Sequence, residues 1–212
     1  TMIYPQNFEN KIGYDQIRHL LKERCLSPMG EERVEEMHFS DHFEEVDEWL
    51  TQTCEMMAIL QGEEEFPAQY YYDVRASLAR IRVEGLYLDE QELFDLRRSL
   101  ETISRIVRFL LHPDEEEMET ADGALPSYRY PCLGRLAADV EVYPQLIKLM
   151  DTILSPYGKI KDNASPELSR IRRELSATMG SIGRTLNSIL RNAQSEGVVD
   201  KDISPTLRDG RL

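Results

Sequence analysis

The chain has 212 residues, of which 41% are hydrophobic and 30% charged, and its net charge is −14. This composition excludes an intrinsically disordered chain, and the acidic balance argues against a protein whose whole surface binds nucleic acid. No stretch approaches the ~18–20 apolar residues of a membrane span, and the first residues lack the features of a secretory signal. Three widely separated cysteines predict reduced, mostly buried thiols. We therefore expect a cytoplasmic protein that does not contact a membrane.

Helical patterns fill the first third of the chain. Gly13 separates a short helix at 7–12 from a second helix, and Ser27-Pro28 is an N-cap followed by proline at the first helical position. Asp41 is expected to cap a helix that runs to about Gln61. Its predicted inward positions are Phe43, Val46, Leu50, Cys54, Met57 and Leu60. Its predicted outward positions are Glu44, Glu45, Asp47, Glu48 and Glu55.

The middle of the chain continues the helical pattern. Asp73 is expected to cap a short helix through Ile81 that ends near Gly85, and Asp89 a long helix to about His112. The pattern fails over 113–131, which predicts a long loop or a small turn-rich insert, and two short helices follow at 133–138 and 143–154. We find no internal repeat and no alternation typical of a sheet. The predicted fold class is therefore all-α, built from packed antiparallel helices.

The longest helical pattern covers 162–197. Ser165 and Pro166 form a helix start, and Gly197 provides a stop. The apolar positions of this helix form one narrow stripe, here called the seam: Leu168, Ile171, Leu175, Met179, Ile182, Leu186, Ile189 and Ala193. At a rise of ~1.5 Å per residue the helix would be roughly 45 Å long. Such a helix resembles a strut that extends from a helical base, because a thin seam rarely serves a small core alone.

Charge is unevenly distributed along the chain. The segment 159–212 carries ten Lys/Arg against seven Asp/Glu, a net of +3, while the rest carries fifteen against thirty-two, a net of −17. The cations that could contact nucleic acid are Lys159, Lys161, Arg170, Arg172, Arg173, Arg184 and Arg191. The competing interpretation is ordinary surface charge with ion pairs four residues apart, such as Arg170 with Glu174.

Other candidate sites are weak. No Gly-rich phosphate loop and no Gly-x-Ser-x-Gly elbow occurs. His38 and His42 are four residues apart, but the helix start between them favours two exposed loop histidines over a metal site. Residues 70–72 are three tyrosines that could stack on bases, although their acidic surroundings favour a packing role. Residues 180–183 match a Gly-x-x-Gly pattern without the surroundings of an RNA-binding loop, which favours a soft point in the helix or a close approach by a neighbouring helix.

Four segments resemble, in order, those of the bacterial MutS paralogues of the second type. Residues 3–18 read Ile-Tyr-Pro-Gln-Asn-Phe-Glu-Asn-Lys-Ile-Gly-Tyr-Asp-Gln-Ile-Arg, and residues 52–55 read Gln-Thr-Cys-Glu. Residues 158–172 match the most specific pattern, which is Gly-x-(Ile/Val)-x-Asp-x-Ala-Ser-x-x-Leu-x-x-Ile-Arg. Residues 208–211, Arg-Asp-Gly-Arg, are similar to the family's Arg-x-Gly-Arg.

The resemblance implies a fold of the MutS core and lever type. A helical core would occupy 1–161, the lever helix 162–197, and the start of the connection to a clamp domain 198–212. The resemblance further implies a much longer homodimeric protein with an ATPase domain that uses ATP and Mg²⁺, and commonly a nuclease domain. The residues of those domains have no counterpart in this sequence, so we expect no catalytic, cofactor or metal site here.

The family is associated with branched DNA, with restraint of homologous recombination and with rescue of collided ribosomes. The resemblance therefore implies that this chain is a non-catalytic core and lever segment of a MutS-like ATPase that clamps DNA or engages the stalled ribosome. The alternative is a stand-alone acidic helical adaptor whose long helix is a coiled-coil arm for a protein partner. A small helical enzyme is the least supported. We also expect the isolated chain to self-associate through the exposed seam or to pack it in a non-physiological way.

Overall fold

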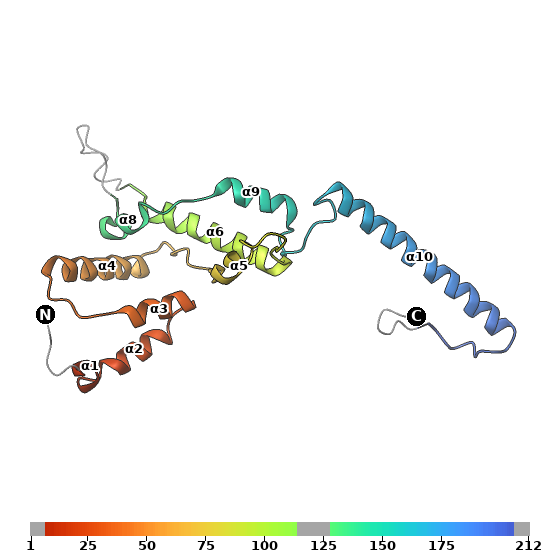
Figure 1. Ribbon diagram of the computed structural model, residues 1–212, viewed down its shortest axis with the longest axis horizontal. Helices are drawn as coiled ribbons and strands as arrows, with labels where there is room; N and C mark the ends of the chain where they lie inside the picture. The colour runs from red at the N-terminus through yellow and green to blue at the C-terminus, as the bar shows by residue number, and fades with distance from the viewer. Residues whose placement is uncertain (1–6, 114–127, 206–212) are drawn as a thin grey trace. The chain divides into compact units, whose positions relative to one another are not determined.

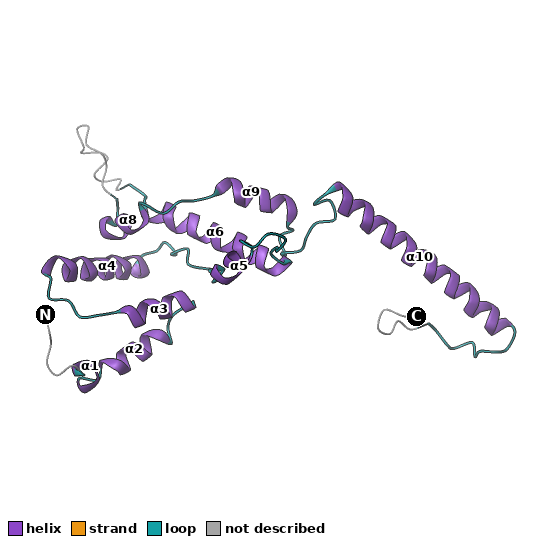
Figure 2. Cartoon of the chain, viewed as in Figure 1, coloured by secondary structure: helices purple, strands orange, loops and turns teal. Residues whose placement is uncertain are grey.

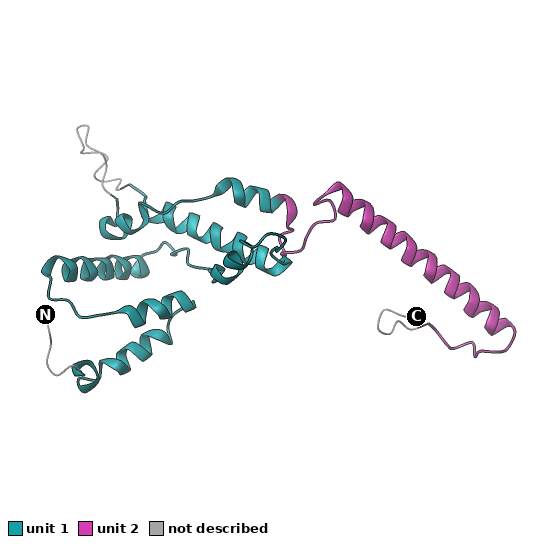
Figure 3. Ribbon diagram, in the orientation of Figure 1, with its two compact units in different colours: residues 1–151 teal, residues 152–212 magenta. Residues whose placement is uncertain are grey.

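The structure is a computed structural model that describes residues 7–113 and 128–205. Within these ranges it contains helices and no strand (Figure 2), so the predicted all-α fold is confirmed. The chain divides into two compact units, Thr1–Asp151 and Thr152–Leu212, which we call unit 1 and unit 2 (Figure 3). The 206–212 segment, with its Arg-Asp-Gly-Arg motif, and most of the predicted loop at 113–131 lie outside the described residues.

Unit 1 begins with three short helices, α1 (Phe8–Lys11), α2 (Tyr14–Lys22) and α3 (Pro28–Glu36) (Figure 1). Gly13 separates α1 from α2 with a left-handed φ of 78°, which a glycine adopts without the steric cost of a side chain. The hydroxyl of Ser27 accepts a hydrogen bond from the N–H of Gly30, as expected for an N-cap. α2 packs against both α1 and α3.

The next helix, α4 (Phe43–Gln61), starts later than predicted. His42 is its N-cap residue, and no side chain caps the first turn, so the predicted cap at Asp41 is wrong. Ser40 instead accepts a hydrogen bond from the N–H of His42 at 3.2 Å. This Ser-based turn outside the helix competes with a cap at Asp41 and moves the helix start onward.

α4 also faces the other way from the prediction. Its apolar stripe is exposed, with exposed fractions of 77% at Phe43, 60% at Leu50 and 53% at Met57. Of the acidic residues predicted to face outward, Glu44 and Asp47 are exposed, whereas Glu48 and Glu55 instead contact α8 (Pro131–Ala137). Glu48 pairs with Arg135, and Glu55 accepts hydrogen bonds from two backbone N–H groups of α8. The inward face also carries Ile59, which is buried, so polar contacts and apolar packing together set this face.

The core of unit 1 is small. Ile59 of α4, Leu110 of α6 (Glu90–Leu110), and Leu133 and Ala137 of α8 form one buried cluster. α8 packs against both α4 and α6. Phe66 and Phe109 add an edge-to-face ring contact at 5.4 Å beside this cluster. Unit 1 therefore depends on few fully buried side chains.

Two further helices start near predicted caps. α6 has a complete capping box, in which Asp89 and Glu92 each accept a hydrogen bond from the other's backbone N–H, so the predicted cap at Asp89 is confirmed. α5 (Arg75–Arg80) instead has Val74 as its N-cap residue. Asp73 was predicted to be that cap. It lies one residue earlier, and its carboxylate accepts from the N–H of Arg75, the first residue of the helix. α9 (Pro144–Ile153) follows α8.

The three cysteines differ in burial, and all are free thiols. Cys132 is buried, Cys25 is half-buried and Cys54 is exposed on α4. Burial raises the pKa of the Cys132 thiol. The prediction of mostly buried thiols is therefore wrong for Cys54, because it lies on the apolar face of α4 that remains open.

Unit 2 consists of a turn followed by one long helix, α10 (Pro166–Ser195) (Figure 1). The turn is closed by backbone hydrogen bonds from Ser155 N–H to Lys159 and from Lys161 N–H to Ile153. None of the described helices, α10 included, is apolar enough over a sufficient length to cross a bilayer.

Candidate nucleic-acid interface

α10 is defined at both ends by its own sequence. Ser165 accepts a hydrogen bond from the N–H of Leu168 at 3.1 Å, and Pro166 occupies the first helical position, as predicted. At the other end Gly197 has a left-handed φ of 72°. The N–H of Val198 donates to the carbonyl of Ala193, which completes the hydrogen-bond pattern of a Schellman motif. These caps fix a helix of 30 residues.

No residue of α10 is buried. The seam is continuous along the helix, and its exposed fraction is 59% at Leu175, 57% at Met179 and 59% at Ile189. A helix of this length gains most of its stability from packing an apolar face against a partner. The open seam therefore marks α10 as a helix built to pack against another segment.

The two cations nearest the start of α10 are engaged within unit 2. Arg170 lies between two acidic residues, with ion pairs to Glu167 at 2.6 Å and to Glu174 at 2.7 Å. These hydrogen bonds raise the pKa of Arg170 and lower that of Glu167. Arg172 pairs with Asp162 and donates to the carbonyl of Ile160 at 3.0 Å, which ties the turn to the helix. The predicted i,i+4 pair of Arg170 with Glu174 is confirmed.

The other five cations predicted to contact nucleic acid lie either in the turn before α10 or along α10 itself. Lys159 and Lys161 lie in the turn before α10, where their backbone N–H groups close the turn through Ser155 and Ile153. Arg173, Arg184 and Arg191 are exposed along α10. The guanidinium of Arg173 donates one N–H to the carbonyl of Ser169 at 3.2 Å, and its other N–H groups remain available to a partner. Arg184 and Arg191 have no hydrogen bond or ion pair to any residue in the described ranges.

The two glycines of α10 do not break it. Gly180 and Gly183 lie inside the continuous helix, and no heavy atom lies within 4 Å of the position a side-chain carbon would occupy at either. The Gly-x-x-Gly pattern is therefore helical rather than a loop. No described neighbour approaches these positions closely, so within the described residues the glycines make no close helix contact. Each glycine costs helix stability of about 1 kcal/mol against alanine, which favours local softness of the helix.

The tyrosine segment 70–72 crosses α6 in unit 1. Tyr70 has a left-handed φ of 60°, and the hydroxyls of the buried residues Ser99 and Thr102 hydrogen-bond to the segment's backbone. The guanidinium of Arg98 lies 4.0 Å from the ring centre of Tyr70 and 5.0 Å from that of Tyr72. Sequence reasoning missed Ser99, Thr102 and Arg98, because small hydroxyls and one arginine in a helical pattern carry no signal of a partner.

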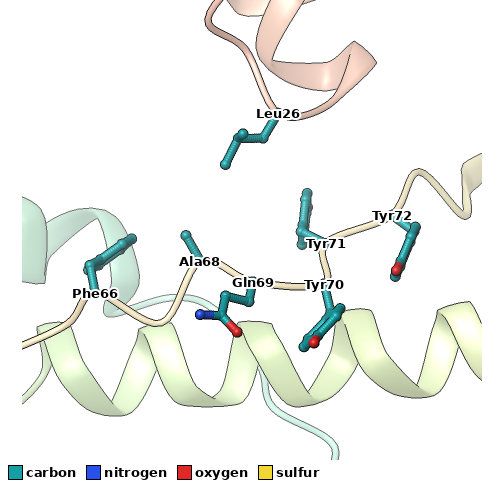
Figure 4. A pocket seen from close by; sticks show the side chains of 7 residues that line it. All are labelled: Leu26, Phe66, Ala68, Gln69, Tyr70, Tyr71 and Tyr72. Carbon is teal, nitrogen blue, oxygen red and sulfur yellow. The ribbon is translucent and has the colours of Figure 1, made fainter.

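An open groove of about 530 Å³ lies beside this segment. Figure 4 shows Leu26, from the turn after α2, opposite the chain from Phe66 to Tyr72. Tyr71 points toward the side of Leu26, while Tyr70 and Tyr72 point toward α6 (Figure 4). The predicted packing role of the tyrosines therefore holds for Tyr72, whereas Tyr70 remains 56% exposed.

The histidines considered as metal ligands make different contacts. His38 makes an edge-to-face contact with Trp49 at 5.5 Å, and His42 is exposed at the start of α4. Over the described ranges no group of three His, Cys, Asp or Glu side chains is arranged to hold a metal ion.

Comparison with known proteins gives a consistent result. The chain is 29% identical to Endonuclease MutS2 of Alkaliphilus oremlandii and 28% identical to that of Geobacillus sp., in each case over 94% of this chain and 24% of the relative. It is 26% identical to Endonuclease MutS2 of Lacticaseibacillus casei over the same shares. The chain thus spans about a quarter of the length of these curated relatives. No protein-family model matches it.

These matches agree with the resemblance carried by the motifs at 3–18, 52–55 and 158–172. They extend over nearly the whole chain, so the similarity is not confined to the motifs. The predicted resemblance is confirmed: the chain is similar, over almost all of its length, to the bacterial proteins named Endonuclease MutS2.

Proposed function

We propose that the chain is the non-catalytic core and lever segment of a longer MutS-like protein that clamps nucleic acid and restrains homologous recombination. Unit 1 provides the base, and α10 provides the lever. The proposed substrates are branched or mismatched DNA, or a stalled ribosome. The relatives' name, Endonuclease MutS2, supports an enzyme at full length. The proposal further includes an ATPase domain that uses ATP and Mg²⁺ and a possible nuclease domain in the longer protein. The proposed assembly of the full protein is a homodimer.

One observation carries the proposal. α10 is a capped helix of 30 residues with no buried side chain and a continuous seam, most of which is exposed. A stiff element of this kind can transmit movement between domains at its two ends, and its seam provides a surface for a second helix. The relatives' length supports the presence of further domains for the lever to connect.

A helix break in α10 tests the lever in the longer protein. Ser181→Pro removes a backbone hydrogen bond in mid-helix and clashes with the preceding turn, at a cost of ~3 kcal/mol or more. We expect this change to abolish the dependence of nucleic-acid binding on ATP, while Ser181→Ala, the control, keeps it. Retention of ATP-dependent binding by Ser181→Pro would show that α10 does not act as a lever.

The alternative function is an acidic helical adaptor that uses α10 as a coiled-coil arm. The exposed seam fits this function equally well, because a two-stranded coiled coil also needs one apolar stripe. The reading frame beyond Leu212 separates the two. Continuation into a Gly-rich phosphate loop ending in Lys-Ser/Thr supports the lever, and a stop codon after Leu212 supports the adaptor.

A further inference from the structure

Three arginines of α10 lie in one line along the helix. At 3.6 residues per turn, Arg184 lies about three turns and Arg191 about five turns beyond Arg173, so all three project from the same side. Ile182 lies about two and a half turns beyond Arg173 and therefore projects from the opposite side, with the rest of the seam. We call the line of Arg173, Arg184 and Arg191 the arginine stripe.

The arginine stripe is free of acidic neighbours on its own helix. The two acidic residues of α10, Glu167 and Glu174, lie roughly a third of a turn away from the line of the stripe. Both are engaged by Arg170. Between Glu174 and the end of α10 the charged residues are Arg184 and Arg191 alone. The residues between the arginines on this side of the helix are Ala177, Gly180 and Asn187, which are small and uncharged.

The guanidinium groups of the arginine stripe also have N–H donors that make no hydrogen bond within the described residues. All three side chains are exposed, Arg173 uses one N–H within the helix, and the other two have no partner among the residues that the structure describes. Arginines that only balanced local charge would be paired, as Arg170 and Arg172 are. Three aligned guanidiniums with free donors form a surface for phosphate groups.

We propose that the arginine stripe binds the phosphate backbone of a nucleic-acid duplex while the seam, on the opposite side of α10, packs against a second helix. This inference rests on the proposed function, because it names the surface of the lever that contacts the clamped nucleic acid. The two faces can be occupied at once, since they point in opposite directions.

The spacing of the stripe fits a duplex. Arg173 and Arg191 are separated by 18 positions, or ~27 Å at a rise of ~1.5 Å per residue. A duplex presents one phosphate charge per ~1.7 Å of its axis and completes a turn in ~34 Å. The three arginines can therefore contact phosphates within one turn of a duplex. The acidic unit 1, with a net charge of −17, offers no comparable field, so the contact is confined to unit 2.

The strength of the contact follows from counterion release. Three phosphate contacts give a salt slope of about −2.7, which predicts binding about 40-fold weaker at roughly 200 mM salt than at roughly 50 mM. Contacts this few place the affinity near ~10⁻⁴ M at physiological salt, the weak end of non-specific binding. The stripe therefore adds to binding by other parts of the longer protein.

The experiment is a salt titration of binding by the 212-residue chain to labelled duplexes of about 20 base pairs, long enough to exceed one turn. One arm uses DNA and the other RNA, since both present the same phosphate chemistry. The stripe variant is Arg173→Gln, Arg184→Gln and Arg191→Gln together. The control variant removes the same charge from unit 2 by Arg170→Gln, Arg172→Gln and Lys201→Gln. Circular dichroism confirms equal helix content.

The proposal predicts that the stripe variant loses most of its salt slope while the control variant keeps it. Binding on the DNA arm alone or on the RNA arm alone would support the stripe and assign the duplex that it prefers. Equal losses in both variants would overturn the stripe, because binding would then follow net charge alone. Absence of binding by the unaltered chain at roughly 50 mM salt would also overturn it. Neither result affects the lever, which is tested separately by Ser181→Pro.

Discussion

The carboxylate of Glu55, on α4, accepts a hydrogen bond from the backbone N–H of Leu133, at the start of α8, at 2.8 Å. Its other oxygen accepts from the N–H of Cys132 at 3.0 Å. One side chain thus supplies the N-terminal cap of a helix that lies far beyond it in the sequence. This contact joins α4 to α8 and fixes which face of α4 turns inward.

Removal of this cap should destabilise unit 1. Glu55→Ala leaves two backbone donors of α8 without their acceptor, and hydrogen bonds to a charged group contribute about 1.5–3 kcal/mol each. We expect the free energy of unfolding to fall by about 3–6 kcal/mol in urea titrations followed by circular dichroism. Glu44→Ala, at an exposed position of the same helix, is the control. Equal stability of the two variants would show that α8 does not depend on Glu55.

The stability of unit 1 should also depend on pH in the acidic range. Hydrogen bonds from the backbone N–H of Asp89, then from Arg80 and Ser77, lower the pKa of Glu92 from its ordinary 4.5 to about 2. Because the pKa is depressed in the folded state, the stabilisation is complete above pH 4.5 and is lost as the pH falls toward 2. Arg75 likewise lowers the pKa of Asp73 to about 2.

Thermal unfolding between roughly pH 6 and roughly pH 2 tests this dependence. Glu92→Gln should flatten the decline below pH 4.5, because a neutral amide no longer titrates. The same change at Glu84, an exposed carboxylate of unit 1 without an ion pair in the described ranges, is the control and should leave the decline as it is. A profile for Glu92→Gln as steep as that of the unaltered chain would contradict the assignment.

The glycines of α10 should weaken the helix. Gly180→Ala and Gly183→Ala each replace a flexible residue at an open helical position, and each should stabilise α10 by about 1 kcal/mol. The expected result is a higher helix content on mild heating, measured by circular dichroism. Gly197→Ala is the contrasting change, because Gly197 has a left-handed φ and alanine would be strained there. Loss of helix content in the first two variants would exclude local softness as their role.

The exposed seam should make the isolated chain self-associate. Its apolar side chains lie along one side of a 30-residue helix, and none of them is buried. We expect sedimentation equilibrium to show dimers or larger species, and Leu175→Ser with Met179→Ser to shift the chain to monomer. A monomeric unaltered chain whose seam remains exposed would contradict this expectation.

Local features of the sequence were sufficient to place most helices. The side chains of Ser27, Asp89 and Ser165 each accept a hydrogen bond from a backbone N–H three residues later in the chain. Such caps can be recognised from sequence spacing alone. Asp41 and Asp73 each lie one residue before the observed N-cap residue. At Asp41 the N–H of His42 donates to Ser40, whereas the carboxylate of Asp73 accepts from the N–H of Arg75, the first residue of α5. The local sequence pattern predicts the presence of a helix more reliably than it predicts the residue at which the helix begins.

Faces and partners were harder to predict than helices. The inward face of α4 carries Glu48, Glu55 and the buried Ile59, whose partners on α8 are distant in sequence. Within the candidate site, the ion pair of Arg170 with Glu174 was visible from spacing, whereas the pairing of Arg172 with Asp162 needed the path of the turn. Periodicity shows that a helix is amphipathic, but it cannot show which groups of another segment will meet it.

The most direct test of the lever is a distance measurement in the longer protein. Fluorescent labels at Glu84→Cys in unit 1 and Asn192→Cys near the end of α10, with the native cysteines replaced, would report movement of unit 2 relative to unit 1. We predict that energy transfer between the labels changes when ATP and Mg²⁺ are added, and that Ser181→Pro abolishes the change. Energy transfer that stays the same with and without ATP, in protein that hydrolyses it, would contradict a lever role for α10.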